Sequence, residues 1–424
     1  MPIQGHLKMD LDTVRRLVGG EIEIANIPGG GSRLAVAADV PLIFDKGTGD
    51  YSIYYDSNNS RWVITAAGID SIYLDNTDLE FINNNRWLKR LAGVKDSAGN
   101  KAVIIVQPGD DIKTELEAAP NGSWVIILSG EYYTSTAIDL SAKKNLRITG
   151  MGWESGTGYN PTIIYTDQNI YLFDLGYNTG STNIIIENLR LEQRAASRTG
   201  RGIYFANQQS SAYRFSDLYI DFFYYGMYAN GNTGGAFKNL RFNDCYRAMV
   251  LTNTHSCLVS DCVFTSCSSM GLFLFGIGSS EITDCVFRNI PYAIYFSAYA
   301  WGFTAPALIT NHSIYDCNIG LVFYATASST TYPRTVLVSN IGFYGNGDVA
   351  VRFDGDYGYA PVAFTGLYLS GSFSYGFYEN GAKSEAYDIP LLANVVATNA
   401  TFSTAAVSLP TANIIEQGHN PGLT

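Results

Sequence analysis

The stretch that decides the fold is residues 215–265, which contains FSDLYID at 215–221, FKNLRFN at 237–243 and VSDCVFT at 259–265. In each copy an Asn or Asp follows an apolar residue by two positions, and apolar residues stand one and three positions after it. Apolar residues at every second position indicate β-strands, whereas helices would space them by three or four. The polar residue between the two apolar runs indicates a bend between two strands.

The same unit recurs from about residue 184 to residue 380. Its polar residue, called here the anchor, is found at Asn188, Asp217, Asn239, Asp261, Asp284, Asn311, Asn340 and, as glycine, Gly366. A second motif, a small residue followed by alternating apolar residues, comes 9 or 10 residues after most anchors, as in Gly271-Leu272-Phe273-Leu274. Three short strands in roughly 25 residues predict one coil of a parallel β-helix. A propeller blade would need four strands and usually 40 or more residues.

Composition excludes several other classes of protein. The 424 residues are 46% hydrophobic and 15% charged, with a net charge of −11. Such a chain can bury a large core, so disorder is excluded. Its negative charge disfavours nucleic acid and anionic membrane surfaces as partners. Residues 1–16 lack the apolar stretch of a signal peptide, and no apolar run is long enough to span a bilayer, so we expect a soluble product without membrane insertion.

A segment before the repeats shows a resemblance to a known superfamily. It reads Gly109-Asp110-Asp111-Ile112, then Leu116 and Ala118-Ala119, then Trp124-Val125-Ile126-Ile127 and Gly130-Glu131-Tyr132. This resembles the start of pectate-lyase-like right-handed β-helices, in which an Asp-Asp pair opens a short capping helix and a Gly-x-Tyr strand begins the first coil. The anchors, with Asn145 as a further one, resemble the asparagine ladder of that superfamily.

The resemblance covers about residues 100–390 and implies an all-β, right-handed, single-stranded parallel β-helix of three strands per coil. Similar chains form phage and archaeal-virus tailspikes. We expect an attachment segment at 1–35, a small β-rich module and junction at 36–95, the β-helix at 96–390 and a cap or tail at 391–424. Strands are predicted at 52–55 and 61–64, and the capping helix at about 111–119.

The six cysteines all fall in the repeats. They are Cys245, Cys257, Cys262, Cys267, Cys285 and Cys317. Cys262 and Cys285 share one inward position, which His312 extends, and stacked like residues favour buried thiols. Disulfides are an alternative, because neighbouring coils lie within bridging distance. A metal site is disfavoured, because side chains of one row point in parallel and do not converge.

One candidate site lies near the N-terminal end of the solenoid. Outward positions are the second and fourth after each anchor, which places Glu192 and Asp221 side by side on neighbouring coils as a candidate acid/base pair for glycoside cleavage. Loops of the first coils add aromatic and arginine side chains, which could bind an anionic glycan. The predicted glycan-binding residues are Trp153, Tyr159, Arg194, Arg198, Arg201 and Tyr219, with Glu154 nearby. The alternative is a solvated surface or a subunit contact.

A second candidate patch lies in loops of the later coils. It consists of Tyr299, Trp301, Tyr332, Asp354, Asp356, Tyr357 and Tyr359. The aromatic rings could stack on sugars, and the alternative is packing against another subunit. Asp354 and Asp356 also suit a Ca²⁺ site, which is the only ion considered, since we expect no other metal and no cofactor.

A third feature is the outward row of the glycine-containing strands, called here the Gly-strand stripe. It consists of Tyr204, Tyr228, Val250, Phe273, Tyr295 and Val322. Such a row is too apolar to face water across many coils, so we expect a homotrimer that buries it.

Three functions are open. The first is a virion spike that attaches to host-surface glycans, with or without cleaving them, and docks to capsid or tail proteins through its N-terminal region. The second is a free, secreted polysaccharide lyase or glycoside hydrolase. The third is a structural virion or appendage protein without glycan activity.

Overall fold

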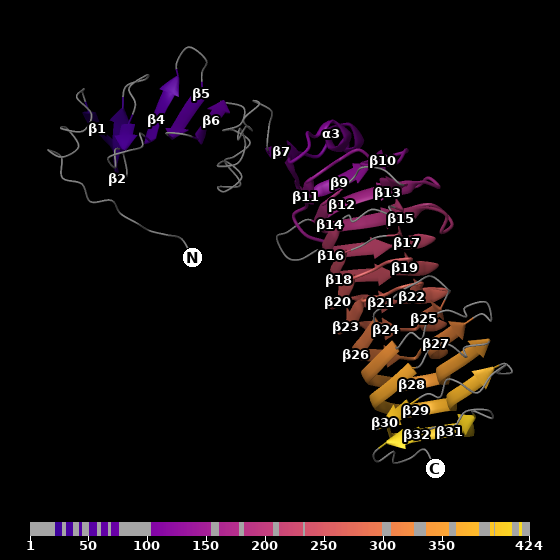
Figure 1. The fold of residues 1–424 in the computed structure, drawn as a ribbon. Helices are drawn as coiled ribbons and strands as arrows, with labels where there is room; N and C mark the ends of the chain where they lie inside the picture. Colours follow the sequence, from indigo (N-terminus) through magenta and orange to yellow (C-terminus); the bar gives the residue numbers. More distant parts are fainter. Residues whose placement is uncertain are drawn as a thin grey trace. The chain divides into compact units, whose positions relative to one another are not determined.

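A computed structural model of the chain shows two compact units, Met1–Ile105 and Val106–Thr424 (Figure 1). The residues it describes are 22–27, 31–36, 42–44, 51–56, 61–66, 69–75, 103–153, 161–177, 182–206, 212–231, 234–298, 307–325, 336–355, 362–380, 391–393, 395–408 and 415–417. The loop residues Glu154 and Tyr159 of the first candidate site lie outside them.

The first unit is a small β module. Its antiparallel strands are β1 (Ile22–Ile27) with β2 (Gly31–Val36), and β3 (Leu42–Phe44), β4 (Tyr51–Asp56), β5 (Arg61–Ala66) and β6 (Ile69–Asp75) in one sheet. The strands predicted at 52–55 and 61–64 are confirmed as β4 and β5, which pair with Ile53 opposite Ile64.

The second unit begins with a strand and the predicted short helix. Its first elements are β7 (Val103–Val106), α3 (Ile112–Ala118), β8 (Trp124–Ile127), β9 (Gly130–Tyr133) and β10 (Ile138–Asp139). Asp111 is the N-cap of α3, because its side chain accepts hydrogen bonds from the amides of Lys113 and Thr114. The α3 side chains Ile112 and Leu116 are fully buried, so the helix covers the interior at the start of the solenoid.

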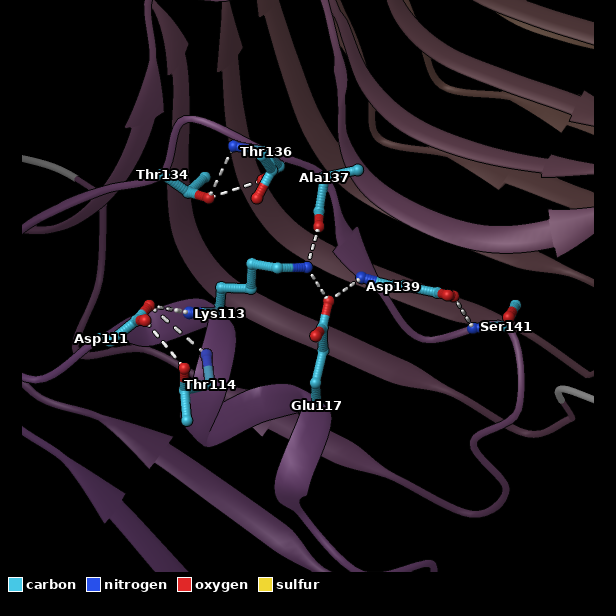
Figure 2. A network of polar contacts seen from close by, with 9 residues as sticks. All are labelled: Asp111, Lys113, Thr114, Glu117, Thr134, Thr136, Ala137, Asp139 and Ser141. Carbon is cyan, nitrogen blue, oxygen red and sulfur yellow. Dashed lines mark hydrogen bonds and ion pairs between the residues drawn. The ribbon is translucent and has the colours of Figure 1, made fainter.

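Polar contacts join this capping helix to the first coil (Figure 2). Lys113 forms an ion pair with Glu117, one turn along α3, and its Nζ donates to the carbonyl of Ala137 at 2.7 Å. Glu117 Oε1 accepts the amide of Asp139 at 2.7 Å. Asp139 in turn accepts the amide of Ser141 at 2.9 Å. Because the bonds of Lys113 and Glu117 use backbone groups of β10 and its flank, they fix the helix on β10.

The remaining strands run along the solenoid. The first half comprises β11 (Arg147–Thr149), β12 (Thr162–Thr166), β13 (Tyr171–Tyr177), β14 (Ile185–Gln193), β15 (Arg201–Ala206), β16 (Arg214–Asp221), β17 (Tyr225–Asn230), β18 (Ala236–Asn243), β19 (Arg247–Thr252), β20 (Leu258–Ser260) and β21 (Val263–Thr265). The second half comprises β22 (Met270–Phe275), β23 (Glu281–Thr283), β24 (Val286–Arg288), β25 (Tyr292–Ala298), β26 (Ala307–Tyr315), β27 (Ile319–Ala325), β28 (Val336–Gly355), β29 (Val362–Asn380), β30 (Leu391–Ala393), β31 (Val396–Ser408) and β32 (Ile415–Gln417).

These strands form a right-handed parallel β-helix, as predicted. Where a coil is most regular, it contains three separate strands, such as β20, β21 and β22, and each pairs in parallel with its equivalent in the next coil (Figure 1). In other coils the first two strands merge into one that bends at the anchor, as in β16 and β18. The decisive prediction was a single interior row of Leu189, Leu218 and Leu240. The three are in register and fully buried.

The anchors are bends in the left-handed backbone region. The seven Asn or Asp anchors have φ between 50° and 58°, and Gly366 has φ 66°. Asn145, predicted as a further anchor, also has a left-handed backbone, but it lies before β11 in register with Asn183, whose Nδ2 donates to Asn145 Oδ1 at 3.0 Å, and so it does not belong to the anchor row. Asn, Asp and Gly are the residues that adopt this region at low cost. Anchors in neighbouring coils also bond to each other: Asn239 Nδ2 donates to Asp217 Oδ1 at 2.6 Å, and Asn340 Nδ2 donates to Asn311 Oδ1 at 3.2 Å. The predicted asparagine ladder is therefore partly present.

The interior is filled by stacked like residues. The rings of Phe242, Phe264 and Phe287 follow one another at centroid distances of 5.2 and 4.7 Å, nearly parallel. All six cysteines are buried free thiols. The small residue of the second motif also has a steric cause, since a Cβ on Gly226 would lie 2.7 Å from the Phe242 ring and 2.6 Å from the Ala248 carbonyl.

The solenoid continues into the segment for which the sequence predicts a cap. Strand β31 pairs in parallel with β29, and β32 pairs in parallel with β30. Parallel coils therefore extend beyond residue 390 to Gln417.

Candidate functional site

The predicted acid/base pair lies on one outward face of the early coils. Glu192 on β14 and Asp221 on β16 are partners in register, as the anchor spacing predicts. Glu131 on β9 belongs to the same face, because β9 pairs with β12 and β12 pairs with β14. We call Glu131, Arg190, Glu192, Arg194 and Asp221 the carboxylate face.

Two arginines connect the three carboxylates into one chain of ion pairs. Arg190 pairs with Glu192 and also reaches Asp221, with 3.6 Å between Nη2 and Oδ2. Arg194 Nε donates to Glu192 Oε2 at 2.8 Å. The remaining nitrogens of Arg194 bind Glu131 in bidentate fashion, at 2.9 Å from Nη1 and 2.7 Å from Nη2. Glu192, which is 8% exposed, therefore stands between two guanidinium groups.

The carboxyl groups at the two ends of this chain of ion pairs have pKa values that are shifted in opposite directions. Burial raises the pKa of Asp221, and the charge of Glu192 acts in the same direction, whereas Arg190 and the amide of Asn243 oppose the rise. Asn243 Nδ2 donates to Asp221 Oδ1 at 3.0 Å. The hydrogen bonds from Arg194 lower the pKa of Glu131. The face thus combines Asp221, a carboxyl group that holds its proton more readily, with Glu131, whose ionised form is stabilised by hydrogen bonds from Arg194.

Aromatic rings flank these charges. Trp153 stacks on Tyr219 with 5.8 Å between ring centroids, and the guanidinium of Arg190 lies 4.8 Å from the Tyr219 ring. Arg194 lies 4.0 Å above the ring of Tyr165. The guanidinium of Arg241 lies 4.6 Å from the ring of Trp153. Two of the aromatic residues predicted for this site, Trp153 and Tyr219, therefore lie together beside the carboxylates.

The three predicted arginines do not form one patch. Arg194 is part of the carboxylate face. Arg198 forms an ion pair with Asp244 and donates to Ser268 Oγ at 3.0 Å, so it contacts later coils. Arg201 is not in a loop at all, because it is the first residue of β15. The sequence predicted that the three arginines share one loop. The structure instead places Arg201 on β15, in a different row of strands from Arg194.

Most of the second candidate patch cannot be located. Tyr299, Trp301, Tyr332, Asp356, Tyr357 and Tyr359 lie outside the described residues. Asp354 is the next-to-last residue of β28 and accepts a hydrogen bond from Arg352 Nε at 2.7 Å. The glycan and Ca²⁺ interpretations of this patch stay predictions.

The Gly-strand stripe differs from the expectation. Its residues are in register as predicted, from Tyr204 opposite Tyr228 to Tyr295 opposite Val322. However, Val250 is 2% exposed and Val322 is fully buried within a single chain. Val322 packs in a cluster against which the rings of Tyr292, Tyr295, Tyr375 and Tyr378 lie. The row is therefore not apolar and exposed throughout, because Val250 and Val322 are already buried within the single chain. Its burial in a homotrimer stays a prediction.

The inward Cys/His row does not converge as metal ligands would. His312 Nδ1 accepts the amide of Cys285 at 3.1 Å, and His312 is 2% exposed. Across the described part of the chain, no group of three or more His, Cys, Asp or Glu side chains has the arrangement of a metal site. In the same residues, no helix is long and apolar enough to cross a bilayer.

Sequence reasoning missed several contributors to the carboxylate face. Glu131 and Tyr165 belong to the first coils, where the predicted anchor Asn145 lies in register with Asn183 and so does not give the outward positions. Arg190 and Arg241 stand two positions after their anchors, but their contacts with Asp221 and Trp153 cross between coils. Extending the register back from Glu192 would have found Tyr165, and extending it from Arg190 through Ile163 would have found Glu131.

Comparisons with known proteins agree with the fold. Residues 177–351 match the family described as "Periplasmic copper-binding protein (NosD)", which is less than half of the chain. The catalytic domain of a GH87 α-1,3-glucanase in complex with tetrasaccharides superposes with a TM-score of 0.53 at 12% identity, over 91% of this chain and 87% of the other. A second GH87 α-1,3-glucanase domain, in complex with nigerose, gives 0.50 at 12% identity, over 84% and 71%.

The enzymatically active domain of bacteriophage CBA120 tailspike protein 2 gives a TM-score of 0.49 at 13% identity, over 85% of this chain and 56% of the other. A search of curated proteins found no match. At 12% identity, the two glucanase domains share the β-helix fold with this chain.

Proposed function

We propose that the protein binds a glycan on its carboxylate face and serves as a virion spike that attaches to host-surface glycans. The observation that carries the proposal is the pairing of Glu192 with Asp221 beside the stacked rings of Trp153 and Tyr219. Ionised oxygens accept hydrogen bonds from sugar hydroxyls, and aromatic rings offer the broad apolar face on which a sugar ring packs.

Several features support the spike context. A small β module precedes an elongated solenoid, and the sequence resembles tailspikes at the start of that solenoid. A glucanase with the same fold binds tetrasaccharides, which supports a saccharide as the ligand of this chain. The N-terminal region would dock to capsid or tail proteins.

Glycan-array binding by the full chain, followed by variants, tests the attachment role. We expect Trp153→Ala to weaken binding of the strongest array hit at least tenfold, since central aromatic contacts carry a large share of binding energy. The matched control is Tyr315→Ala, which removes an outward ring stacked on Tyr344 at 4.9 Å in a later coil. Equal binding by Trp153→Ala and Tyr315→Ala would place the glycan elsewhere.

A second candidate is cleavage of the bound glycan. The raised pKa of Asp221 suits a general acid, and Glu192, which pairs with two arginines, would stabilise positive charge or act as a base. A free lyase or hydrolase would use the same two groups. A structural virion protein would use neither.

A reducing-end assay on the array hits separates attachment from cleavage. We expect Asp221→Asn to lower any cleavage rate by about 10²–10⁴-fold while binding persists, because general acid catalysis contributes that much. Ultraviolet absorbance of an unsaturated product would identify a lyase. Binding without new reducing ends in the unmodified protein would leave attachment as the function and remove cleavage.

A further inference from the structure

A second charged surface lies on different strands from the carboxylate face. The first residues of β15, β17 and β19 stack in register with the first residue of β13. In order they are Tyr171, Arg201, Tyr225 and Arg247, which we call the Tyr–Arg ladder. Aromatic and cationic side chains therefore alternate, one per coil, along the solenoid.

The arginines of the ladder lie against aromatic rings. The guanidinium of Arg201 is 4.6 Å from the ring of Tyr171 and 5.4 Å from that of Tyr225. That of Arg247 is 5.9 Å from Tyr225, and it also approaches Tyr246 and Phe273 at 5.7 and 5.5 Å. Stacking holds both guanidinium planes in place but leaves their hydrogen-bonding edges without a charged acceptor.

Neither ladder arginine is neutralised by an acid. Arg147, Arg190, Arg194, Arg198 and Arg352 each form an ion pair with Glu or Asp. Within the described residues Arg201 and Arg247 form none, although the chain carries a net charge of −11. Nε of Arg247 is buried and has no hydrogen-bond partner. Asp174 is on this face, in register with Tyr204, yet it forms no ion pair with Arg201.

Further tyrosines widen this surface. Tyr204 stacks between Tyr171 and Tyr228, with centroid distances of 4.3 and 5.7 Å. Tyr224 stacks on Tyr246 at 4.6 Å. These rings and both arginines are partly exposed. The surface is thus a row of aromatic rings with two fixed positive charges.

We propose that the Tyr–Arg ladder binds an acidic polysaccharide whose carboxylates are two sugars apart and whose chain runs along the solenoid. Arg201 and Arg247 are separated by two coils, or about 10 Å at the usual spacing of paired strands. That distance is close to the length of a disaccharide, so the two arginines would bind the carboxylates of two sugars that are separated by one other sugar. The tyrosines between them would contact the intervening sugar ring. Arginine recognises carboxylates in bidentate geometry, which selects acidic over neutral chains.

The inference does not depend on the proposed function of the carboxylate face, since the two surfaces use different strands. Titration calorimetry of the full chain with hyaluronan oligosaccharides, in which glucuronate alternates with an uncharged sugar, tests it, with oligogalacturonate as a second acidic probe and dextran as the neutral one. We expect both acidic probes to bind, dextran not to bind, and added NaCl to weaken binding. Arg201→Gln and Arg247→Gln should each weaken it about tenfold, the usual cost of one charged hydrogen-bonding contact.

Arg288→Gln is the matched control, because Arg288 lies 5.2 Å from the ring of Tyr315 on a different strand row and loses the same charge. It should bind as the unmodified protein does. Failure of both acidic probes to bind, or unchanged binding in both ladder variants, would overturn the inference. So would a fall in molecular mass of Arg201→Gln, since the ladder would then be a contact between copies of the chain. Thermal melting confirms that each variant is folded.

Discussion

At the scale of single residues, the anchors explain why Asn and Asp recur in the sequence. Each anchor lies between two strands with its backbone in the left-handed region. Most residues adopt this region only at a cost in free energy, whereas Asn, Asp and Gly adopt it more readily. The anchor amides also form bonds between coils, as from Asn239 to Asp217. One residue type therefore serves both the bend and the contact with the next coil.

Replacing an anchor separates these two contributions. We expect Asn239→Ala to lower the free energy of unfolding by about 2–3 kcal/mol, of which about 1–2 kcal/mol is backbone strain and about 1 kcal/mol the lost hydrogen bond. Asn239→Gly removes only the bond, so it should be less harmful. Denaturant unfolding measures both, and equal destabilisation by Ala and Gly would show that the backbone conformation contributes nothing.

Asp221 is the residue whose ionisation should respond most clearly to its neighbours. Asn243 donates to its carboxylate and so favours the charged form. We expect Asn243→Ala to raise the pKa of Asp221 further, as followed by carbon NMR of the carboxyl group. Asn253→Ala, which removes a similar bond to Asn230, is the control. A pKa that falls or stays constant in Asn243→Ala would contradict the assignment.

The same pKa has a consequence for stability. Because folding raises the pKa of Asp221 above its unfolded value, its contribution to stability is fully present below the unfolded pKa and is lost as pH rises through the folded pKa. Replacing it with Asn removes this dependence. We therefore expect the melting temperature of Asp221→Asn, relative to the unmodified protein, to increase as pH rises from 3 to 7. A difference that is constant with pH would show that the carboxyl group titrates normally.

At the scale of strands, the interior is built from rows that repeat the same side chain. The rings of Phe242, Phe264 and Phe287 stack across three coils and are at most 1% exposed. The small residue of the glycine-containing strand leaves room for them, since a Cβ on Gly226 would collide with Phe242. Strand sequence and interior packing are therefore coupled from coil to coil.

Removing the central ring of this row should be costly. We expect Phe264→Ala to destabilise the protein by about 3–5 kcal/mol, because it leaves a cavity between two rings that cannot close. Phe273→Ala removes a ring of the same size from the partly exposed outward row and should cost clearly less. Denaturant unfolding of both variants measures this difference, and similar values would mean that the interior relaxes around the cavity.

At the scale of the whole molecule, the outward rows differ in what they offer a partner. The carboxylate face neutralises most of its own charge, whereas the Tyr–Arg ladder does not. Farther along the glycine-containing strands, Tyr292 and Tyr295 lie over a buried aliphatic cluster. That later part of the Gly-strand stripe is the apolar surface best suited to contact another copy of the chain.

We retain the prediction of a homotrimer, with its interface at this later part of the stripe. Sedimentation should give three times the 46.3-kDa mass of the chain, and Tyr295→Glu should shift it toward the monomer, because a buried charge without a partner is unfavourable. Arg288→Glu, on another strand row, should leave the mass unchanged. A 46-kDa species in the unmodified protein would refute the trimer.

The sequence by itself determined the fold and its register. Apolar residues at every second position and a polar residue at each bend specify which side chains enter the interior, because a strand alternates its faces strictly. Leu189, Leu218 and Leu240 therefore fell into one row as predicted, and Glu192 came to lie beside Asp221. Neither result needed knowledge of contacts between distant residues.

Only the tertiary structure decided how the surface charges are paired. Arg194 binds Glu131, 63 residues earlier, and Arg198 reaches Asp244, 46 residues later. A long side chain can reach partners in several coils. The strand period determines the face of the sheet from which the side chain leaves, but it does not determine the direction in which the side chain then extends. For the same reason the sequence grouped three arginines that the structure separates, and it did not show that Arg201 and Arg247 lack acidic partners among the described residues.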